Sequence, residues 1–314
     1  MLRYLRLRDS LRIEMKATLP LNCLAIAIAA FTFAAGKVNA QDSSMIVTTS
    51  EGVGAFNSTL SGTSVEDFNN LVGTHSGVVW DGVGTFDNLH VINADQYGGA
   101  PGAIGKGATP YAVEGLSGSG AVKTTTLTLN TPSSYFGLYW SAGDSANNLK
   151  FYSGNSLVAN FSTANLMDKL AQSYYGNPNT AGSWGGKNAG EPYGFINFIG
   201  GVGTTWDSIV FSNTANSGFE ADNYTVRTDG WNPVTDGALP GTPIVLLETI
   251  GGVQSTTGIT GVTAVDGKVT IATASGVVAF APAAPGAPAP PMTACLAFAG
   301  VLVLQALRRN KVSQ

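Results

Sequence analysis

Residues 122–161 read VKTTTLTLNTPSSYFGLYWSAGDSANNLKFYSGNSLVANF. Within this stretch, residues 122–129 alternate between polar and apolar side chains and contain many β-branched residues, while residues 135–140 are rich in aromatic rings. Residues 149–152 run into a Ser-Gly-Asn-Ser turn that leads to residues 157–161. Such short alternating runs are typical of strands with one buried face. We therefore expect these segments to form consecutive antiparallel strands.

Further short strands are expected on both sides of this stretch, at residues 78–80, 89–92, 194–199, 208–212 and 223–228. Only residues 163–174 have apolar side chains at helical spacing, with a Ser and a Thr at the start that suit a helix cap. One short helix among at least eight strands predicts an all-β fold, a jelly-roll-like antiparallel β-sandwich.

Charged residues are scarce and mostly acidic. The chain has 314 residues, of which only 11% are charged, which excludes a charge-rich disordered protein, a coiled coil and a basic nucleic-acid binder. Residues 41–291 contain 7 basic and 18 acidic residues, a net charge of −11. Nucleic acid and anionic membrane surfaces are therefore not expected as partners of this part, whereas divalent cations and neutral polysaccharides stay open.

The N-terminal residues predict an export signal. Residues 1–12 carry four arginines, an apolar run follows at residues 19–35, and small residues precede Gln41. We expect a signal helix over residues 1–40 that signal peptidase removes between Ala40 and Gln41. Translation from an internal methionine and a retained N-terminal membrane anchor are alternatives that the sequence leaves open.

The C-terminal residues predict a membrane segment. Residues 282–291 form a Pro/Ala linker that favours extended chain. The apolar residues 292–307 predict a transmembrane helix, and residues 308–314 predict a basic cytoplasmic tail. Sixteen apolar residues are marginal for a permanent span.

Two domains are expected between these ends. Residues 41–235 should form the β-sandwich, and residues 236–281 are a Thr/Val/Gly-rich β-hairpin element with an Asp-Gly turn. The sequence leaves open whether this element joins the sandwich or forms a stalk.

The proline motif, apolar helix and basic tail together resemble the PEP-CTERM sorting signal of bacterial exosortase substrates. The motif here is Pro288, Ala289, Pro290 and Pro291, without the Glu of the namesake motif. The resemblance implies an exosortase-type processing protease as partner and delivery to the cell surface or extracellular matrix. The chain would be anchored in the membrane at its C-terminus, transiently or permanently. An ordinary single-pass anchor without sorting is the alternative.

A second resemblance covers residues 78–227. Its motifs are residues 135–144, 147–149, 151–154, 173–178, 191–198 and 217–226, the last reading Ser-Gly-Phe-Glu-Ala-Asp-Asn-Tyr-Thr-Val. These motifs are similar to a family of exosortase-dependent surface proteins found in cyanobacteria and other bacteria. The resemblance implies a location at the cell surface rather than a molecular activity.

Acidic residues in this last motif suggest a metal site. Glu220, Asp222 and Asn223 would crowd the end of a loop while Phe219 fills the sandwich. Either Asp144 with Asn147 and Asn148, or Asp87 with Asn88, would complete a set of hard oxygen ligands for Ca²⁺ if the fold brings them together. The alternative is that these side chains cap turns and satisfy backbone amides.

Aromatic residues pose a similar choice. Trp184 lies in a Gly-Ser-Trp-Gly-Gly loop, and it and Tyr175 are candidates for stacking on sugar rings. The aromatic residues of 135–140 are expected in the core. Either the even-numbered residues of that run or Tyr135 and Tyr139 should point inward, since side chains alternate along a strand.

Catalytic residue types are few. The chain has two histidines, and its two cysteines, Cys23 and Cys295, both lie in the targeting segments. A thiol enzyme and a multi-histidine metal site are thereby excluded, and no Gly-x-Ser-x-Gly motif occurs. We predict a non-enzymatic surface or matrix protein associated with exopolysaccharide. A lectin-like carbohydrate-binding module assisted by Ca²⁺ and an unsorted membrane-anchored protein are the alternatives.

Overall fold

The computed structural model describes residues 42–280 except 50–53, 101–108, 118–120, 180–182, 214 and 266–267. The predicted signal helix, the cleavage site between Ala40 and Gln41, the motif at Pro288–Pro291 and the C-terminal helix lie outside these residues. No helix in the described ranges is long and apolar enough to cross a membrane.

The predicted all-β class is confirmed. Among the described residues, sixteen strands pair antiparallel, and the helical part is one turn of α-helix, α2 (Ala164–Met167), and a 3₁₀ turn, η1 (Gln172–Tyr174). The strands are β1 (Ser43–Thr49), β2 (Ser64–Glu66), β3 (Gly73–Trp80), β4 (Gly84–Ile92), β5 (Tyr111–Glu114), β6 (Thr124–Ser133), β7 (Tyr135–Ser141), β8 (Asn147–Ser153), β9 (Ser156–Ser162), β10 (Gly194–Gly200), β11 (Trp206–Asn213), β12 (Phe219–Arg227), β13 (Thr242–Ile250), β14 (Val253–Val265), β15 (Lys268–Thr273) and β16 (Gly276–Phe280).

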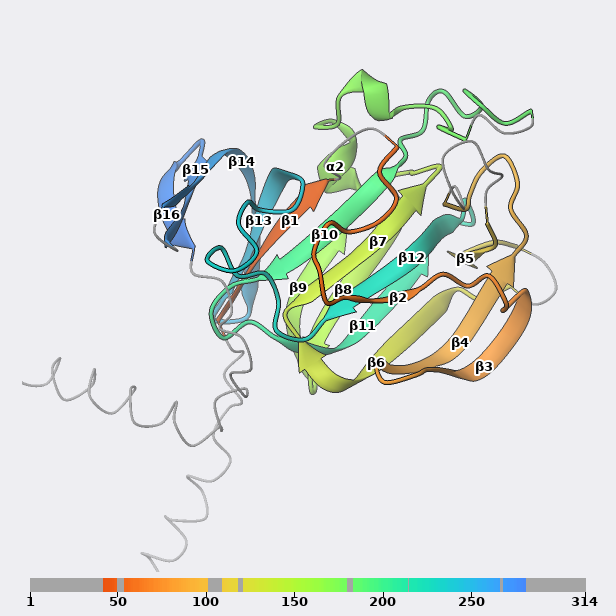
Figure 1. Ribbon diagram of the computed structural model, residues 1–314, viewed down its shortest axis with the longest axis horizontal. Helices are drawn as coiled ribbons and strands as arrows, with labels where there is room; N and C mark the ends of the chain where they lie inside the picture. The colour runs from red at the N-terminus through yellow and green to blue at the C-terminus, as the bar shows by residue number, and fades with distance from the viewer. Residues whose placement is uncertain are drawn as a thin grey trace, which may run out of the picture. The chain divides into compact units, whose positions relative to one another are not determined.

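One continuous sheet folds back on itself to make the two layers of the sandwich (Figure 1). Hydrogen-bonded neighbours follow the order β16-β15-β14-β13-β1-β10-β7-β12-β5-β4-β6-β11-β8-β9, with β2 beside β12 and β3 beside β4. The layer β13-β1-β10-β7-β12 packs against the layer β4-β6-β11-β8-β9, and β5 connects the two.

Aromatic rings fill the space between the layers. Phe136 on β7 lies 5.7 Å from Phe211 and 6.3 Å from Phe151, both in the opposite layer, measured between ring centroids. Its ring is also 6.1 Å from Phe198 on β10 and 5.6 Å from Tyr224 on β12. Phe136 is fully buried and connects both layers of the core.

Both faces of β7 are buried. The even-numbered residues and the two tyrosines of this strand, which the sequence left as alternatives for the buried side, are therefore all packed. Phe136, Leu138 and Trp140 face the interlayer core. Tyr135 and Tyr139 point to the outer face, where the segments that connect the strands cover them. The aromatic run thus belongs to a strand with packed side chains on both faces, the interlayer core on one face and the covered outer surface on the other.

The predicted order of strands was wrong at two points: β6 pairs with β4 and β11 and not with β7, and β7 does not pair with β8. The hairpin of β8 and β9 is confirmed, but β7 pairs with β10 and β12 and not with β8. Residues 142–146 carry the chain from one layer to the other, and an alternating pattern does not report such a crossing. β12 also begins at Phe219, four residues before the expected start of the strand at residues 223–228.

The predicted helix over residues 163–174 is reduced to α2 and η1. Leu166 is the only buried residue of α2, so this segment has no continuous apolar face to support a longer helix. Ala171 already has extended backbone angles, which ends the helical path.

The open edge of β9 is closed by side chains. Gln254 on β14 both accepts from the Asn160 backbone N–H (2.6 Å) and donates to the Asn160 carbonyl oxygen (2.7 Å). The Val158 carbonyl accepts from the hydroxyls of Ser43 (2.7 Å) and Thr249 (2.9 Å). These bonds replace a strand ladder and hold β9 against β1, β13 and β14.

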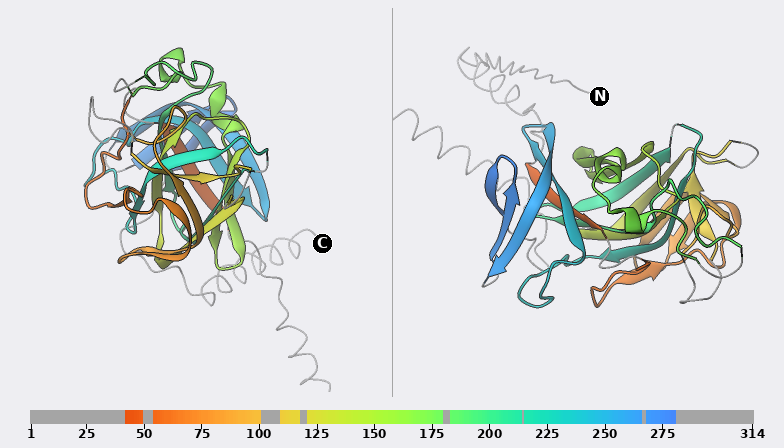
Figure 2. Two further views of the ribbon diagram at one scale, coloured as in Figure 1. Left: turned by 90° about the vertical axis from the view of Figure 1, so that its right-hand side faces the viewer. Right: turned by 90° about the horizontal axis from the view of Figure 1, so that it is seen from above.

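The C-terminal element joins the sandwich. β13 pairs with β1 over residues 43–49, and β14, β15 and β16 continue the sheet from there. Val269, Ile271 and Phe280 pack on Leu246 in a second apolar cluster. Figure 2 shows β14–β16, coloured blue, at one end of this sheet.

Candidate functional site

Buried and half-buried acids gather with tyrosines at the outer face of β7 and β12. Cross-strand pairing sets Glu220 opposite Ser141 and Asp222 opposite Tyr139. Because Trp140 faces the interlayer core, these neighbours point outward. We call the group the acidic–tyrosine cluster; its members are Asp95, Tyr111, Tyr139, Ser141, Asp144, Glu191, Tyr193, Glu220 and Asp222.

Asp222 on β12 is hydrogen-bonded to Ala100 and Thr109. Its Oδ2 accepts hydrogen bonds from the Ala100 backbone N–H (2.7 Å) and from the Thr109 hydroxyl (2.8 Å). Its Oδ1 accepts from the Asn223 N–H (2.7 Å). Burial raises the pKa of Asp222 to about 7, although these three donors oppose the shift. The Asp222 carboxyl group therefore accepts hydrogen bonds from both Ala100 and Thr109.

Glu220 is buried beside the other acids of the cluster. Burial raises its pKa well above the usual range, and the charges of Asp144, Glu191 and Asp95 raise it further. Within the described residues, Glu220 Oε2 and the Ser141 hydroxyl have no hydrogen-bond partner. The surroundings therefore favour the protonated, neutral form of Glu220.

Two of the three tyrosines of the cluster, Tyr111 and Tyr193, act as neutral donors, whereas the Tyr139 hydroxyl has no hydrogen-bond partner among the described residues. Burial raises the pKa of Tyr111 and of Tyr193 well above the usual value. Tyr111 Oη donates to Asp95 Oδ1 (3.0 Å), and Tyr193 Oη donates to the Gln96 carbonyl (3.2 Å). They hold the segment around Asp95 against the sheet.

The structure brings three of the four predicted metal ligands, Glu220, Asp222 and Asp144, to this cluster. Asp144 Oδ1 accepts from the Ala146 N–H (2.6 Å), so both aspartates bind backbone amides, as the turn interpretation expects. Across the ranges that the structure describes, no group of three or more acidic, histidine or cysteine residues is placed to hold a metal ion.

The fourth predicted ligand points elsewhere. Asn223 has a left-handed backbone with φ of 49°, and its side-chain amide donates to the Phe56 carbonyl (2.8 Å) and to Asn57 Oδ1 (3.0 Å). It forms the bulge at which β12 shifts register against β7.

The predicted sugar-stacking residues share one loop region. The backbone N–H of Asn177 donates to the Lys187 carbonyl (2.7 Å), which joins the segments that contain Tyr175 and Trp184. Tyr175 is half-buried, and its Oη donates to the Met167 carbonyl (2.6 Å), so it anchors the loop to α2. Trp184 is half-buried in the turn that Lys187 closes.

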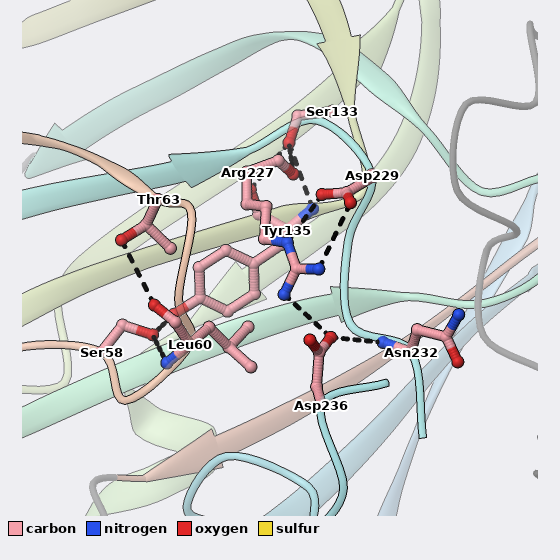
Figure 3. Close-up of polar contacts among 9 residues, drawn as sticks. All are labelled: Ser58, Leu60, Thr63, Ser133, Tyr135, Arg227, Asp229, Asn232 and Asp236. Carbon is pink, nitrogen blue, oxygen red and sulfur yellow. Dashed lines mark hydrogen bonds and ion pairs between the residues drawn. The ribbon is translucent and has the colours of Figure 1, made fainter. Parts of the chain in front are cut away.

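A charge network that the sequence did not predict lies at the other end of β12 (Figure 3). Arg227 pairs with Asp229 (Nε to Oδ1, 2.6 Å) and with Asp236 (Nη1 to Oδ2, 2.8 Å). Asp236 also accepts from the Asn232 N–H (2.8 Å). The two carboxylates raise the pKa of the guanidinium and connect β12 to the chain that leads into β13.

Arg227 also borders a groove of about 240 Å³ between β2, β6 and β12. The other lining residues are Gly62, Ser64, Gly82, Val83, Thr131, Val226 and Thr228. Because two carboxylates already neutralise Arg227, the groove has no free positive charge from this side chain to attract an anion.

A third polar group lies inside the sandwich. Glu114, at the end of β5, is fully buried, and neither carboxyl oxygen has a hydrogen-bond partner among the described residues. Burial raises its pKa to about 7; the Thr125 hydroxyl beside it opposes the shift, and the charge of Asp87 adds to it. Burial raises the pKa of Tyr224, and the charge of the nearby Glu114 raises it further.

No model of a known protein family matches the chain, and no curated protein matches it. Among solved structures, the chain is similar to the catalytic domain of a GH87 alpha-1,3-glucanase variant in complex with tetrasaccharides. The sequence identity is 11%, the TM-score is 0.26, and the match covers 60% of this chain and 28% of that chain. A TM-score this low supports no inference about function.

Proposed function

We propose that this chain is a non-enzymatic protein that is exported, sorted to the cell surface or extracellular matrix by an exosortase-type system, and associated there with exopolysaccharide. The observation that carries the proposal is the C-terminal order of a proline motif, an apolar segment and a basic tail after a cysteine-free domain. An all-β sandwich that needs no disulfide fits a secreted product whose stability comes from packing.

Sorting predicts a shortened mature protein. The protein recovered from the surface of the producing cell is expected to lack residues 292–314 when its mass is measured by mass spectrometry. Replacing Pro290 and Pro291 with alanine should leave the tail in place, whereas Pro285→Ala, in the linker outside the motif, should not. A surface protein that keeps the whole tail would instead be a plain membrane-anchored protein.

A lectin-like role is the second candidate, and the half-buried Trp184 in its loop favours it. In this case the exported protein binds the host exopolysaccharide saturably in affinity electrophoresis, and Trp184→Ala weakens binding about tenfold, which corresponds to about 1.4 kcal/mol. Tyr152→Ala, a half-buried aromatic on β8, is the matched control and should bind normally. Loss of binding with chelator would show that binding depends on a divalent cation, and no binding at all would leave a structural matrix protein.

A further inference from the structure

The two ends of the long sheet differ in how their open edges are protected. At β9, side chains from β1, β13 and β14 bind the backbone groups of the edge. At the other end, β16 pairs with β15 alone over residues 276–280. Within the described residues, the outward backbone groups of β16 therefore have no strand beside them, and such an edge is a template for another strand.

The sequence of β16, Gly-Val-Val-Ala-Phe, contains no charged residue and no proline, which are the usual means of blocking an edge. Val277 is 70% exposed. Val278 and Phe280 alternate with it and face inward, and Phe280 belongs to the second apolar cluster. β16 thus has a buried face that fixes its position and an unprotected edge.

The segment that contains β14–β16 has no net charge, whereas the rest of the domain is strongly acidic. Residues 41–250 have a net charge of −11, whereas residues 251–280 contain one acid and one base, Asp266 and Lys268. Two copies of the chain therefore repel each other over most of their surface and least at β14–β16. A second copy also brings an equally neutral edge, so no like charges meet.

We propose that β16 is a homotypic docking edge, at which two copies of this chain pair antiparallel about a twofold axis through Val278. This pairing sets Val277 beside Ala279 of the second copy and Gly276 beside Phe280, and it covers an exposed valine on each side. One sheet then runs through both molecules. The inference is independent of the polysaccharide role and goes beyond it.

Sedimentation equilibrium of the exported protein tests this edge. The wild type is expected to show a concentration-dependent monomer–dimer equilibrium. Val277→Lys, which adds a charge to the edge, should raise the dissociation constant at least tenfold. Val265→Lys is the matched control, because Val265 is 59% exposed but lies on β14, which has a strand on its other side. Circular dichroism melts show whether both variants keep the fold.

Crosslinking tests the register independently. In a Cys295→Ser background, Val278→Cys places the single cysteine of the mature chain at the twofold axis. Mild oxidation should then give a covalent dimer, while Val265→Cys should stay monomeric. A protein that is monomeric at all concentrations, or a dimer that Val277→Lys leaves unchanged, would overturn the proposal.

Discussion

Phe136→Ala is expected to lower the free energy of unfolding by about 3–5 kcal/mol, the largest loss that we expect from a single substitution in the interlayer core. The ring of Phe136 contacts aromatic rings on its own layer and on the opposite one, and the residue is fully buried. Removing it leaves a cavity that two rigid sheets cannot collapse to fill. Urea denaturation followed by far-UV circular dichroism measures the effect.

Two further variants make this result specific. Phe136→Leu retains most of the apolar volume and should cost less than Phe136→Ala. Val79→Ala removes an apolar side chain that is 69% exposed on β3 and should change stability by no more than about 0.5 kcal/mol. A loss below about 1 kcal/mol for Phe136→Ala would show that Phe136 does not join the two layers.

Alternation along the chain was sufficient to predict the fold class and many of the strands, but β1, β2, β5 and β16 were not predicted. The β8–β9 hairpin and the β14–β15 hairpin follow from local pattern, because both partners and the turn lie within one short stretch. The neighbours of β7 could not be predicted in this way, since β10 and β12 come more than 50 residues later. Strand order depends on contacts between distant segments, which periodicity does not report.

Only part of the acidic–tyrosine cluster could be predicted from the sequence, for the same reason. Glu220 and Asp222 stand out because they are two residues apart in one motif. Asp95 and Glu191 carry no comparable local signal, and only the topology brings their charges near Glu220. The sequence shows that Arg227 is basic, but its partners Asp229 and Asp236 could be assigned only from the structure of the turn that follows β12.

Buried acids link the stability of this domain to pH. The pKa values of Glu114, Glu220 and Asp222 are all raised, chiefly by burial. An acid whose pKa is higher in the folded state keeps its proton on folding, so stability falls as the pH rises from the unfolded pKa to the folded one. The negative net charge of the domain acts in the same direction. We therefore expect the wild type to be more stable at mildly acidic pH than at alkaline pH.

Glu114→Gln isolates the share of this effect that comes from an acid without hydrogen-bond partners among the described residues. For Glu114 the pKa rises from 4.5 to about 7, so the cost of ionisation is absent below pH 4.5, grows between pH 4.5 and 7, and is complete above pH 7. A difference of one in pKa between the folded and unfolded states corresponds to about 1.36 kcal/mol, so ionisation of Glu114 lowers the free energy of unfolding by about 3 kcal/mol in all. The glutamine variant should therefore be more stable than the wild type by about this amount at pH 9 and similar to it at pH 4.

Urea denaturation of both proteins at several pH values measures this difference, which should rise between pH 4.5 and 7 and then stay constant. Asp87, Thr125 and Tyr224 surround Glu114 and are present in both proteins, so their contributions cancel in the comparison. Glu248→Gln, a half-buried carboxyl group on β13, is the control and should follow the wild-type curve. A difference that does not change with pH would mean that Glu114 has a compensating partner in the folded protein, and that the interior of the sandwich tolerates its charge.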